Sequence, residues 1–214
     1  MTKLILESCQ PRKVIGIDAS NEFIAHARHS IAGPNVHFET GNAQALKLKA
    51  NSIDVVVSGI MLNFVPQPET ALMEMKKVVK PGGVIGIFLW DYAKGMEMLR
   101  YFWDAAVQLD DNAKEYDEGI RFALCQDGQL ESLVKKVGLK QVEARAIDIT
   151  TKFQDFNDYW IPFLGKVGPA PSYNLSLSQE NRQKLEDKLR RSLPVEDDGS
   201  ISLGARAWAV KGTA

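Results

Sequence analysis

The chain has 214 residues, 45% of them hydrophobic and 25% charged, with a formal net charge of −1, which is the composition of an ordinary globular protein with a full core. The balanced charge gives no sign of a nucleic-acid surface, and no apolar run approaches the length of a membrane span. Its two cysteines, Cys9 and Cys125, are too few for a disulfide framework, so we expect a reduced, cytoplasmic protein with neither a nucleic-acid nor a membrane partner.

The first part of the chain alternates short apolar runs with segments of helical period. Runs without strict alternation, which are typical of strands covered by helices on both faces, are Val14 to Ile17, Ile53 to Val57 and Val84 to Leu89. Val36 to Thr40 adds a short strand. Between the strands, Phe23 to Ile31 and Ala71 to Val79 carry apolar stripes of helical period. Ser20 is placed to cap the first of these helices, and Pro81-Gly82-Gly83 ends the second. Strands alternating with helices predict an α/β fold, a doubly wound and mostly parallel sheet.

The pattern changes after Leu89. Long amphipathic helices are expected around Met96 to Ala106 and Leu130 to Val137, followed by extended segments at Val142 to Thr150 and Ser202 to Val210. The last segment alternates as an antiparallel C-terminal strand would. Residues 151–194 form a long insertion rich in aromatics and proline, whose length predicts a lid or substrate-binding segment within a single domain spanning 1–214.

Histidines and basic residues indicate no special site. His26 and His29 have no carboxylate or thiolate at metal-ligand spacing and His37 falls on an expected strand, so we predict no metal site. The basic cluster from Lys184 to Arg191 is interrupted by acidic residues and is interpreted as a solvated helix face.

Polar residues follow the expected strands where an open parallel sheet binds its ligands, at the carboxyl ends. These positions hold Asp18, Gly41-Asn42-Ala43, Ser58-Gly59 and Trp90-Asp91-Tyr92. A carboxylate such as Asp18 can accept two hydrogen bonds from a ribose diol, which suits a nucleoside cofactor. The alternative is that Asp18 only caps the following helix.

Four segments in this order resemble the class I S-adenosylmethionine-dependent methyltransferases, particularly those acting on small molecules. The segments read VIGIDAS from Val14, GNAQAL from Gly41, IDVVVS from Ile53 and VKPGG from Val79. The resemblance implies a Rossmann-like sheet, S-adenosyl-L-methionine as cofactor and a small-molecule methyl acceptor. The cofactor-binding residues that it implies are Asp18, Ala19, Asn42, Ala43, Gln44, Ser58 and Gly59.

The chain departs from the family pattern in two places. Asn42 replaces the common aspartate, although its amide oxygen can still accept a hydrogen bond from the adenine amino group. The family's first strand, with its G-x-G-x-G turn, is missing: Thr2 to Ser8 resembles only the helix that follows it, with Leu4, Ile5 and Cys9 able to face the sheet.

Loss of a central strand has structural consequences. We expect the strand at Val14 to Asp18 to pair directly with the strand at Ile53 to Ser58, or another chain to fill the gap, because open edges of buried strands are costly. Direct pairing would narrow the cofactor crevice and make this chain a weak binder. An exposed edge would also favour homo-oligomers.

An acceptor oxygen or nitrogen can need a base, and Asp91 and Tyr92 are the best-placed candidates. Aromatic residues that could wall an apolar acceptor pocket, or equally pack in the core, are Trp90, Tyr101, Trp103, Tyr159 and Trp160.

The leading hypothesis is methyl transfer from S-adenosylmethionine to a small molecule, with activity impaired in this truncated chain. NAD is disfavoured because no G-x-G-x-x-G follows a strand, and nucleic-acid methylation because Gly59 to Leu62 lacks the proline-aromatic signature of base methylases. The alternative is a non-catalytic remnant that serves as a binding or assembly module. An in-frame glycine turn encoded upstream of Met1 would favour the enzyme hypothesis, and this is the result that we expect. A stop codon there would favour the remnant hypothesis.

Overall fold

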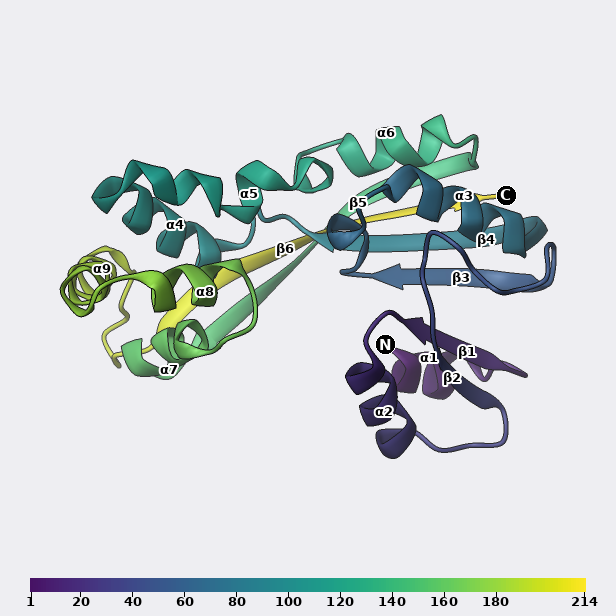
Figure 1. Cartoon of the computed structure of the whole chain (residues 1–214), viewed down its shortest axis with the longest axis horizontal. Coiled ribbons are helices and arrows are strands. Elements are labelled where there is room, and N and C mark those ends of the chain that lie inside the picture. The colour runs from purple at the N-terminus through teal and green to yellow at the C-terminus, as the bar shows by residue number, and fades with distance from the viewer. The chain divides into compact units, whose positions relative to one another are not determined.

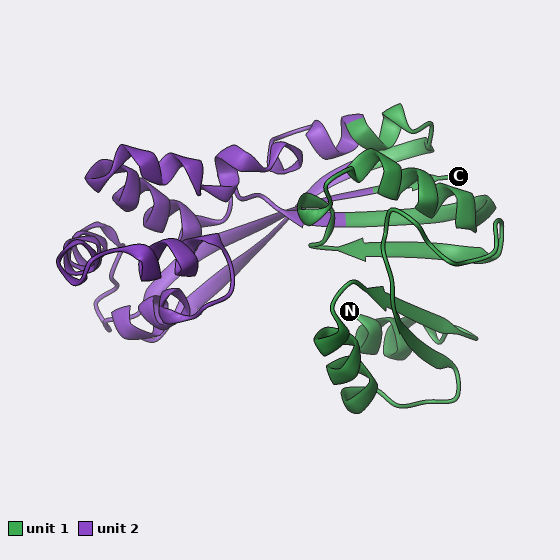
Figure 2. Cartoon of the chain, in the orientation of Figure 1, with its two compact units in different colours: residues 1–87, 133–143, 211–214 green, residues 88–132, 144–210 purple.

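The computed structural model describes residues 1–214, which form two compact units (Figure 2). Unit 1 comprises residues 1–87, 133–143 and 211–214, and unit 2 comprises residues 88–132 and 144–210. The long strands β5 (Lys140–Phe153) and β6 (Ile201–Thr213) run through both units. The predicted α/β architecture is confirmed, since helices alternate with strands through the first half of the chain (Figure 1).

A two-stranded parallel sheet forms the N-terminal part of unit 1. It pairs β1 (Val14–Asp18) with β2 (Val36–Thr40). The strands approach closely because Gly16 lacks a side chain: a Cβ there would lie 2.5 Å from the Phe38 ring. Helix α2 (Asn21–Ser30) packs on both strands, and the predicted cap is confirmed, with Ser20 Oγ accepting the Phe23 N–H at 3.1 Å.

The predicted helix at the start of the chain is present as α1 (Thr2–Cys9), which packs against β1. Its predicted apolar face is wrong in part. Leu4 is 66% exposed and Cys9 is also exposed, while Ile5 is half-buried. No residue of α1 is fully buried, because no second layer covers the helix along its length.

The remaining strands form a four-stranded sheet of order β3-β4-β6-β5, with β3 at Ile53–Gly59 and β4 at Val79–Trp90. In unit 1, Lys211 of β6 pairs with Glu143 at 3.1 Å, and Thr213 donates to Gln141 at 3.2 Å. Residue numbers rise along β6 as they fall along β5, so the predicted antiparallel C-terminal strand is confirmed. Helix α3 (Pro68–Val78) begins at a proline and buries the predicted stripe of Ala71, Leu72, Met75 and Val78.

The expected direct pairing of β1 with β3 is wrong, because the two strands belong to separate sheets. That expectation assumed that both edges would be buried. Val55 and Val57 of β3 are instead 56% and 40% exposed, so the face of the strand that carries these two side chains lies in water, and the strand is not buried on both faces. Coverage of the edge by another chain stays a prediction.

Unit 2 is built around an aromatic core. Phe102, Trp103, Tyr159 and Phe163 are each at most 1% exposed, and the Phe102 and Phe163 rings stack at 4.5 Å. The helices of this unit are α4 (Glu97–Leu109), α5 (Glu118–Arg121), α7 (Phe156–Trp160), α8 (Pro169–Ser176) and α9 (Gln179–Ser192), with 3-10 turns at Asp111–Glu115, Ala123–Cys125 and Ile161–Leu164. The predicted insertion supplies α7 to α9, and α9 packs on α4. Its role as a lid stays a prediction.

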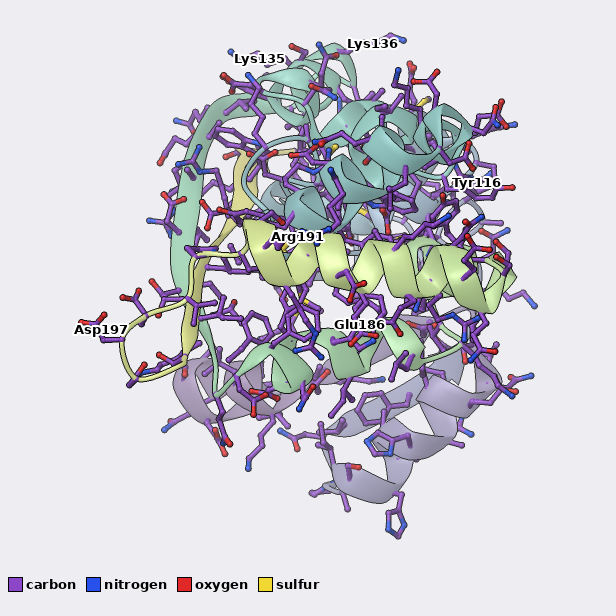
Figure 3. The ribbon with its side chains drawn as sticks, turned by 90° about the vertical axis from the view of Figure 1, so that its left-hand side faces the viewer. Tyr116, Lys135, Lys136, Glu186, Arg191 and Asp197 are labelled. Atoms are coloured by element: carbon purple, nitrogen blue, oxygen red, sulfur yellow. The ribbon has the colours of Figure 1, made fainter.

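The basic cluster lies on α9 as a solvated face. Lys184 pairs with Glu180 at 2.6 Å and Arg190 with Glu186 at 2.8 Å, one helical turn apart. Arg191 is exposed on the same helix, and Asp197 lies on the loop between α9 and β6 (Figure 3).

None of the helices combines the length and apolar character that crossing a membrane requires. Helix α6 (Gln129–Lys136) precedes β5 and begins after Gly128, which has a positive φ of 73°.

Candidate functional site

In unit 1, the end of β1 meets the turn that follows β2. Gly41 N–H donates to the Asp18 carbonyl at 2.9 Å, so the turn starts beside the aspartate. Asp18 is exposed, and its Oδ1 accepts the Ser20 N–H at 2.8 Å. The carboxylate therefore orders the start of α2 through one oxygen and leaves Oδ2 open to solvent. Both interpretations of Asp18, a helix-end contact and a ligand acceptor, are compatible with this geometry.

The turn after β2 is held by its own side chain. Asn42 Oδ1 accepts the Gln44 N–H at 2.9 Å, and the Asn42 carbonyl accepts the Ala45 N–H at 3.0 Å. Asn42 is exposed, while Ala43 and Gln44 are half-buried. One lone pair of the amide oxygen is thus used within the turn, and the other remains for a ligand.

Hydrogen bonds connect this turn to the segment between β3 and α3. Gln44 Oε1 accepts the Gln67 N–H at 3.4 Å, and Glu74 Oε2 accepts the Leu46 N–H at 2.8 Å. A hydrogen bond from Lys77, with a smaller contribution from the Leu46 N–H, lowers the pKa of Glu74, so this carboxylate stays charged at neutral pH. The predicted cofactor residues at the end of β1 and in the turn after β2 therefore lie on segments joined by hydrogen bonds, and this turn is also bonded to the start of α3.

The end of β3 and the turn that follows it combine a strained backbone position with unpartnered polar atoms. Ser58 is 5% exposed, and its buried Oγ has no hydrogen-bond partner. The Oδ1 of Asn63 is also buried without a partner, and Ile60 has a φ of 55°, which a β-branched residue rarely adopts. Asn63 was missed by the sequence reasoning. Its signal was an amide within a stretch, Val55 to Pro68, that contains no charged residue.

The predicted catalytic pair lies in unit 2, on the turn after β4. Asp91 is 2% exposed, its Oδ1 accepts the Lys94 N–H at 2.9 Å, and its N–H donates to the Arg206 carbonyl at 2.8 Å. The turn closes on Gly95, where a Cβ would lie 2.8 Å from Asp91 Oδ2. Burial, aided by the charges of nearby Glu118 and Cys125, raises the pKa of Tyr92 to about 12. Tyr92 is therefore a phenol at neutral pH that can donate a hydrogen bond but cannot take up a proton.

A buried polar cluster that the sequence did not indicate packs against this turn, and it comprises Arg100, Trp103, Asp117 and Glu118. Glu118 is 4% exposed and its Oε2 accepts the Trp103 indole N–H, while Asp117 forms a two-point ion pair with Arg100. Burial raises the pKa of the Glu118 carboxyl above its usual value. Helix α5 touches the turn directly, because a Cβ at Gly119 would lie 2.6 Å from the Tyr92 carbonyl oxygen.

The aromatic residues proposed as pocket walls fall into two groups. Trp103 and Tyr159 are fully buried in the core of unit 2, and Tyr159 donates its hydroxyl to the Met98 carbonyl at 2.9 Å. Trp160 is 6% exposed, whereas Trp90 and Tyr101 are half-buried. The last two have the surface that contact with a ligand requires.

The fold is similar to that of solved methyltransferase structures. The structure resembles a methyltransferase of Bacillus halodurans, with a TM-score of 0.58 at 15% identity, over 94% of this chain and 82% of that one. It also resembles a methyltransferase from an antibiotic biosynthesis pathway of Anabaena variabilis, with a TM-score of 0.58 at 16% identity, over 100% and 96% of the two chains. Phosphoethanolamine N-methyltransferase 2 of Haemonchus contortus, solved with S-adenosyl-L-methionine, gives a TM-score of 0.57 at 16% identity, over 99% and 45%.

Residues 1–87 match the family model described as a methyltransferase domain, which confirms the predicted resemblance. A protein of Mycobacterium tuberculosis is 34% identical over 79 residues, which are 36% of this chain and 29% of that protein. Demethylmenaquinone methyltransferase of Lactococcus lactis is 40% identical over 74 residues, which are 33% of this chain and 29% of the enzyme. The match thus spans under a third of the length of these curated relatives.

Proposed function

We propose that the protein is an S-adenosylmethionine-dependent methyltransferase that acts on a small-molecule acceptor. The observation that carries the proposal is the set of acceptors in unit 1. Asp18 Oδ2 accepts no hydrogen bond at the end of β1, the Asp18 carbonyl accepts the N–H of Gly41 in the turn after β2, and Gln44 of that turn bonds to Gln67 at the start of α3. A free carboxylate oxygen suits a ribose diol, and the unpartnered oxygens of Ser58 and Asn63 suit further donors of the cofactor.

When bound, the cofactor would supply an electrophilic sulfonium methyl group, so the protein has to contribute position more than reactivity. Aligning an acceptor with such a group can contribute roughly 7–11 kcal/mol in favourable cases. In unit 1, Asp18 would hold the ribose and Asn42, Ala43 and Gln44 would line the adenine. These are binding roles that require no proton transfer.

The acceptor side of the proposal rests on unit 2. Asp91 is the proposed base for an acceptor oxygen or nitrogen, since Tyr92 keeps its proton and can only orient the acceptor by donating a hydrogen bond. Trp90 and Tyr101, with their half-exposed rings, would contact the acceptor's apolar part. Small-molecule acceptors are supported by the names of the relatives, which include a demethylmenaquinone methyltransferase and a phosphoethanolamine N-methyltransferase.

Isothermal titration with S-adenosylhomocysteine, with NAD as the comparison ligand, tests the proposal on the full chain. We expect S-adenosylhomocysteine to bind and NAD not to bind. Asp18→Ala should weaken binding by about tenfold, the value of a charge-assisted hydrogen bond pair. Asp54→Ala is the matched control, because Asp54 is exposed on β3 and pairs only with Lys80. Tight NAD binding, or equal losses in the two variants, would overturn the proposal.

The alternative function, a non-catalytic binding or assembly module, is favoured by one observation. The β1 and β3 edges are unpaired within the chain, and one face of β3 exposes Val55 and Val57. An open strand edge can pair with a strand of another chain, including a second copy. A chain that binds no S-adenosylhomocysteine but forms concentration-dependent oligomers in sedimentation would support this alternative.

A further inference from the structure

The segment from Ile161 to Leu175 in unit 2 is apolar on its outer side as well as on its inner side. The inner side packs in the core, where Phe163 and Tyr173 are buried. Large apolar side chains also remain exposed on this segment, namely Ile161, Leu164, Val167 and Leu175. Val167 is 86% exposed, more than any other large hydrophobic residue of the chain. Exposed apolar side chains that gather in this way mark a surface that contacts a protein or a membrane.

The elements that carry these side chains pack together. Ile161 and Leu164 lie three residues apart in the 3-10 turn Ile161–Leu164, where side chains at that spacing eclipse each other. Helix α8, which carries Leu175, packs on this turn, and Asn174 donates its amide N–H to the Phe163 carbonyl at 2.9 Å. The exposed side chains therefore belong to one packed part of unit 2.

The only charge in this part of the chain is positive. From Tyr159 to Gln179, Lys166 is the only charged residue, and it is exposed between Leu164 and Val167. From Ile161 to Pro171 it is also the only polar side chain. No carboxylate of this stretch would therefore repel an anionic surface.

Helix α9 adds further positive charge beside the segment. Arg182 donates to the Leu175 carbonyl at 3.2 Å, so the start of α9 adjoins the end of α8. The basic residues of α9 outnumber its acidic ones, with Arg182, Lys184, Lys188, Arg190 and Arg191 against Glu180, Glu186 and Asp187. The whole chain has a net charge of −1, so this part of unit 2 is positive against the average of the molecule.

We propose that the apolar segment from Ile161 to Leu175, together with the basic residues of α9, docks unit 2 on an anionic lipid surface. Apolar side chains insert at the boundary between headgroups and acyl chains, and basic side chains beside them attract anionic headgroups. Protein interfaces have a polar rim, which this segment does not offer, so its composition favours lipid over a protein partner.

The inference concerns contact with a membrane surface and requires no spanning helix. The expectation of no membrane partner rested on the charge of the whole chain and on the length of its apolar runs, and neither bears on docking through one segment. The inference does not depend on methyl transfer, so either proposal can fail while the other holds.

Vesicle flotation with the full chain tests the inference. The probes are vesicles of phosphatidylcholine alone and vesicles that also contain phosphatidylglycerol. We expect the chain to bind the anionic vesicles more tightly, and high salt to weaken this binding because it screens charge. Val167→Asp should weaken binding by about tenfold. Met73→Asp is the matched control, because Met73 is 58% exposed on α3 in unit 1, and it should bind as the wild-type chain does.

A second pair of variants tests the basic residues. Lys184→Glu combined with Arg191→Glu should weaken binding to the anionic vesicles by about tenfold and leave binding to phosphatidylcholine unchanged. Lys47→Glu combined with Lys49→Glu makes the same change in net charge at exposed positions of unit 1, and it should weaken binding by at most about twofold.

Thermal unfolding separates docking from damage to the fold. All the substituted side chains are exposed, so melting temperatures should stay within about 2 °C of the wild-type value. Absence of binding by the wild-type chain overturns the inference, as does equal binding to both kinds of vesicle or an equal loss in Val167→Asp and Met73→Asp. A chain that ignores vesicles but self-associates in sedimentation, and loses this association in Val167→Asp, overturns it in favour of a second copy.

Discussion

Removing Asp117 should destabilise unit 2 more than any other single loss of charge in the chain. The Asp117 side chain is 5% exposed and that of its partner Arg100 is 17% exposed, and the two groups meet in a two-point ion pair with one contact of 3.0 Å. Asp117 Oδ1 also accepts the Gly119 N–H at 2.8 Å and so caps α5. The Nε of Arg100 already lacks a partner. In Asp117→Ala the largely buried guanidinium would lose its ion-pair partner.

The expected magnitude follows from these contacts. Breaking a buried ion pair by removing one member costs about 3–5 kcal/mol, whereas an exposed pair contributes about 0–1 kcal/mol. Asp111→Ala is the matched control, because Asp111 pairs with Lys114 and its side chain is 81% exposed. Asp117→Asn should be less harmful than Asp117→Ala by about 1 kcal/mol, since an asparagine can still cap the helix.

Urea unfolding followed by tryptophan fluorescence measures this loss directly. All four tryptophans lie in unit 2, so the signal reports the unit that contains the ion pair. Replacing both partners, in Arg100→Met with Asp117→Leu, should recover most of the stability lost in Asp117→Ala, because no buried charge is left alone. If Asp117→Ala and Asp111→Ala unfold within about 1 kcal/mol of each other, the ion pair is not the buried element that the structure indicates.

Other perturbations have expected outcomes of their own. Burial raises the pKa of Glu118 above its ordinary 4.5, so the folded chain keeps this proton to a higher pH than the unfolded chain does. The free energy of unfolding should therefore fall as the pH rises from 4.5 through the raised pKa. Urea midpoints measured against pH should show this slope in the wild-type chain and not in Glu118→Gln. Gly16→Val would place a side chain against the Phe38 ring and should destabilise the first sheet by about 1–3 kcal/mol, seen as faster amide exchange in β1 and β2, and unchanged exchange would contradict the close approach. Val57→Lys should lower self-association in sedimentation if copies of the chain pair at the β3 edge, and an unchanged oligomer would exclude that edge.

Local patterns predicted the elements of the fold well. Ser20 caps α2 as expected, the stripe from Ala71 to Val78 is buried, and the last strand is antiparallel. These features depend on residues close together in sequence, where the period of hydrophobicity and the chemistry of capping decide the structure.

The predictions that were wrong depend on which surfaces of the strands and aromatic residues are covered in the folded chain. Direct pairing of β1 with β3 followed from the assumption that an apolar strand is buried on both faces, yet Val55 and Val57 remain in water. The same apolar composition serves a covered strand and an edge strand, so sequence alone does not separate them. Likewise, the sequence does not distinguish an aromatic residue in a pocket wall from one in a core. Trp103 and Tyr159 are wholly buried, and only the half-buried Trp90 and Tyr101 have surface that a ligand could contact.

The hydrogen bonding of buried side chains identified Asn63 and Glu118, which the sequence motifs did not indicate. Each is an ordinary polar residue in sequence, and neither lies in a segment that resembles the family's motifs. Asn63 becomes informative because its oxygen is buried with no partner, and Glu118 because it is buried with a partner, the indole of Trp103, and a raised pKa. A satisfied acceptor such as Glu118, beside the Asp117–Arg100 ion pair, stabilises the turn that carries Asp91 and Tyr92. Substitution of Glu118 is therefore expected to change the stability of unit 2.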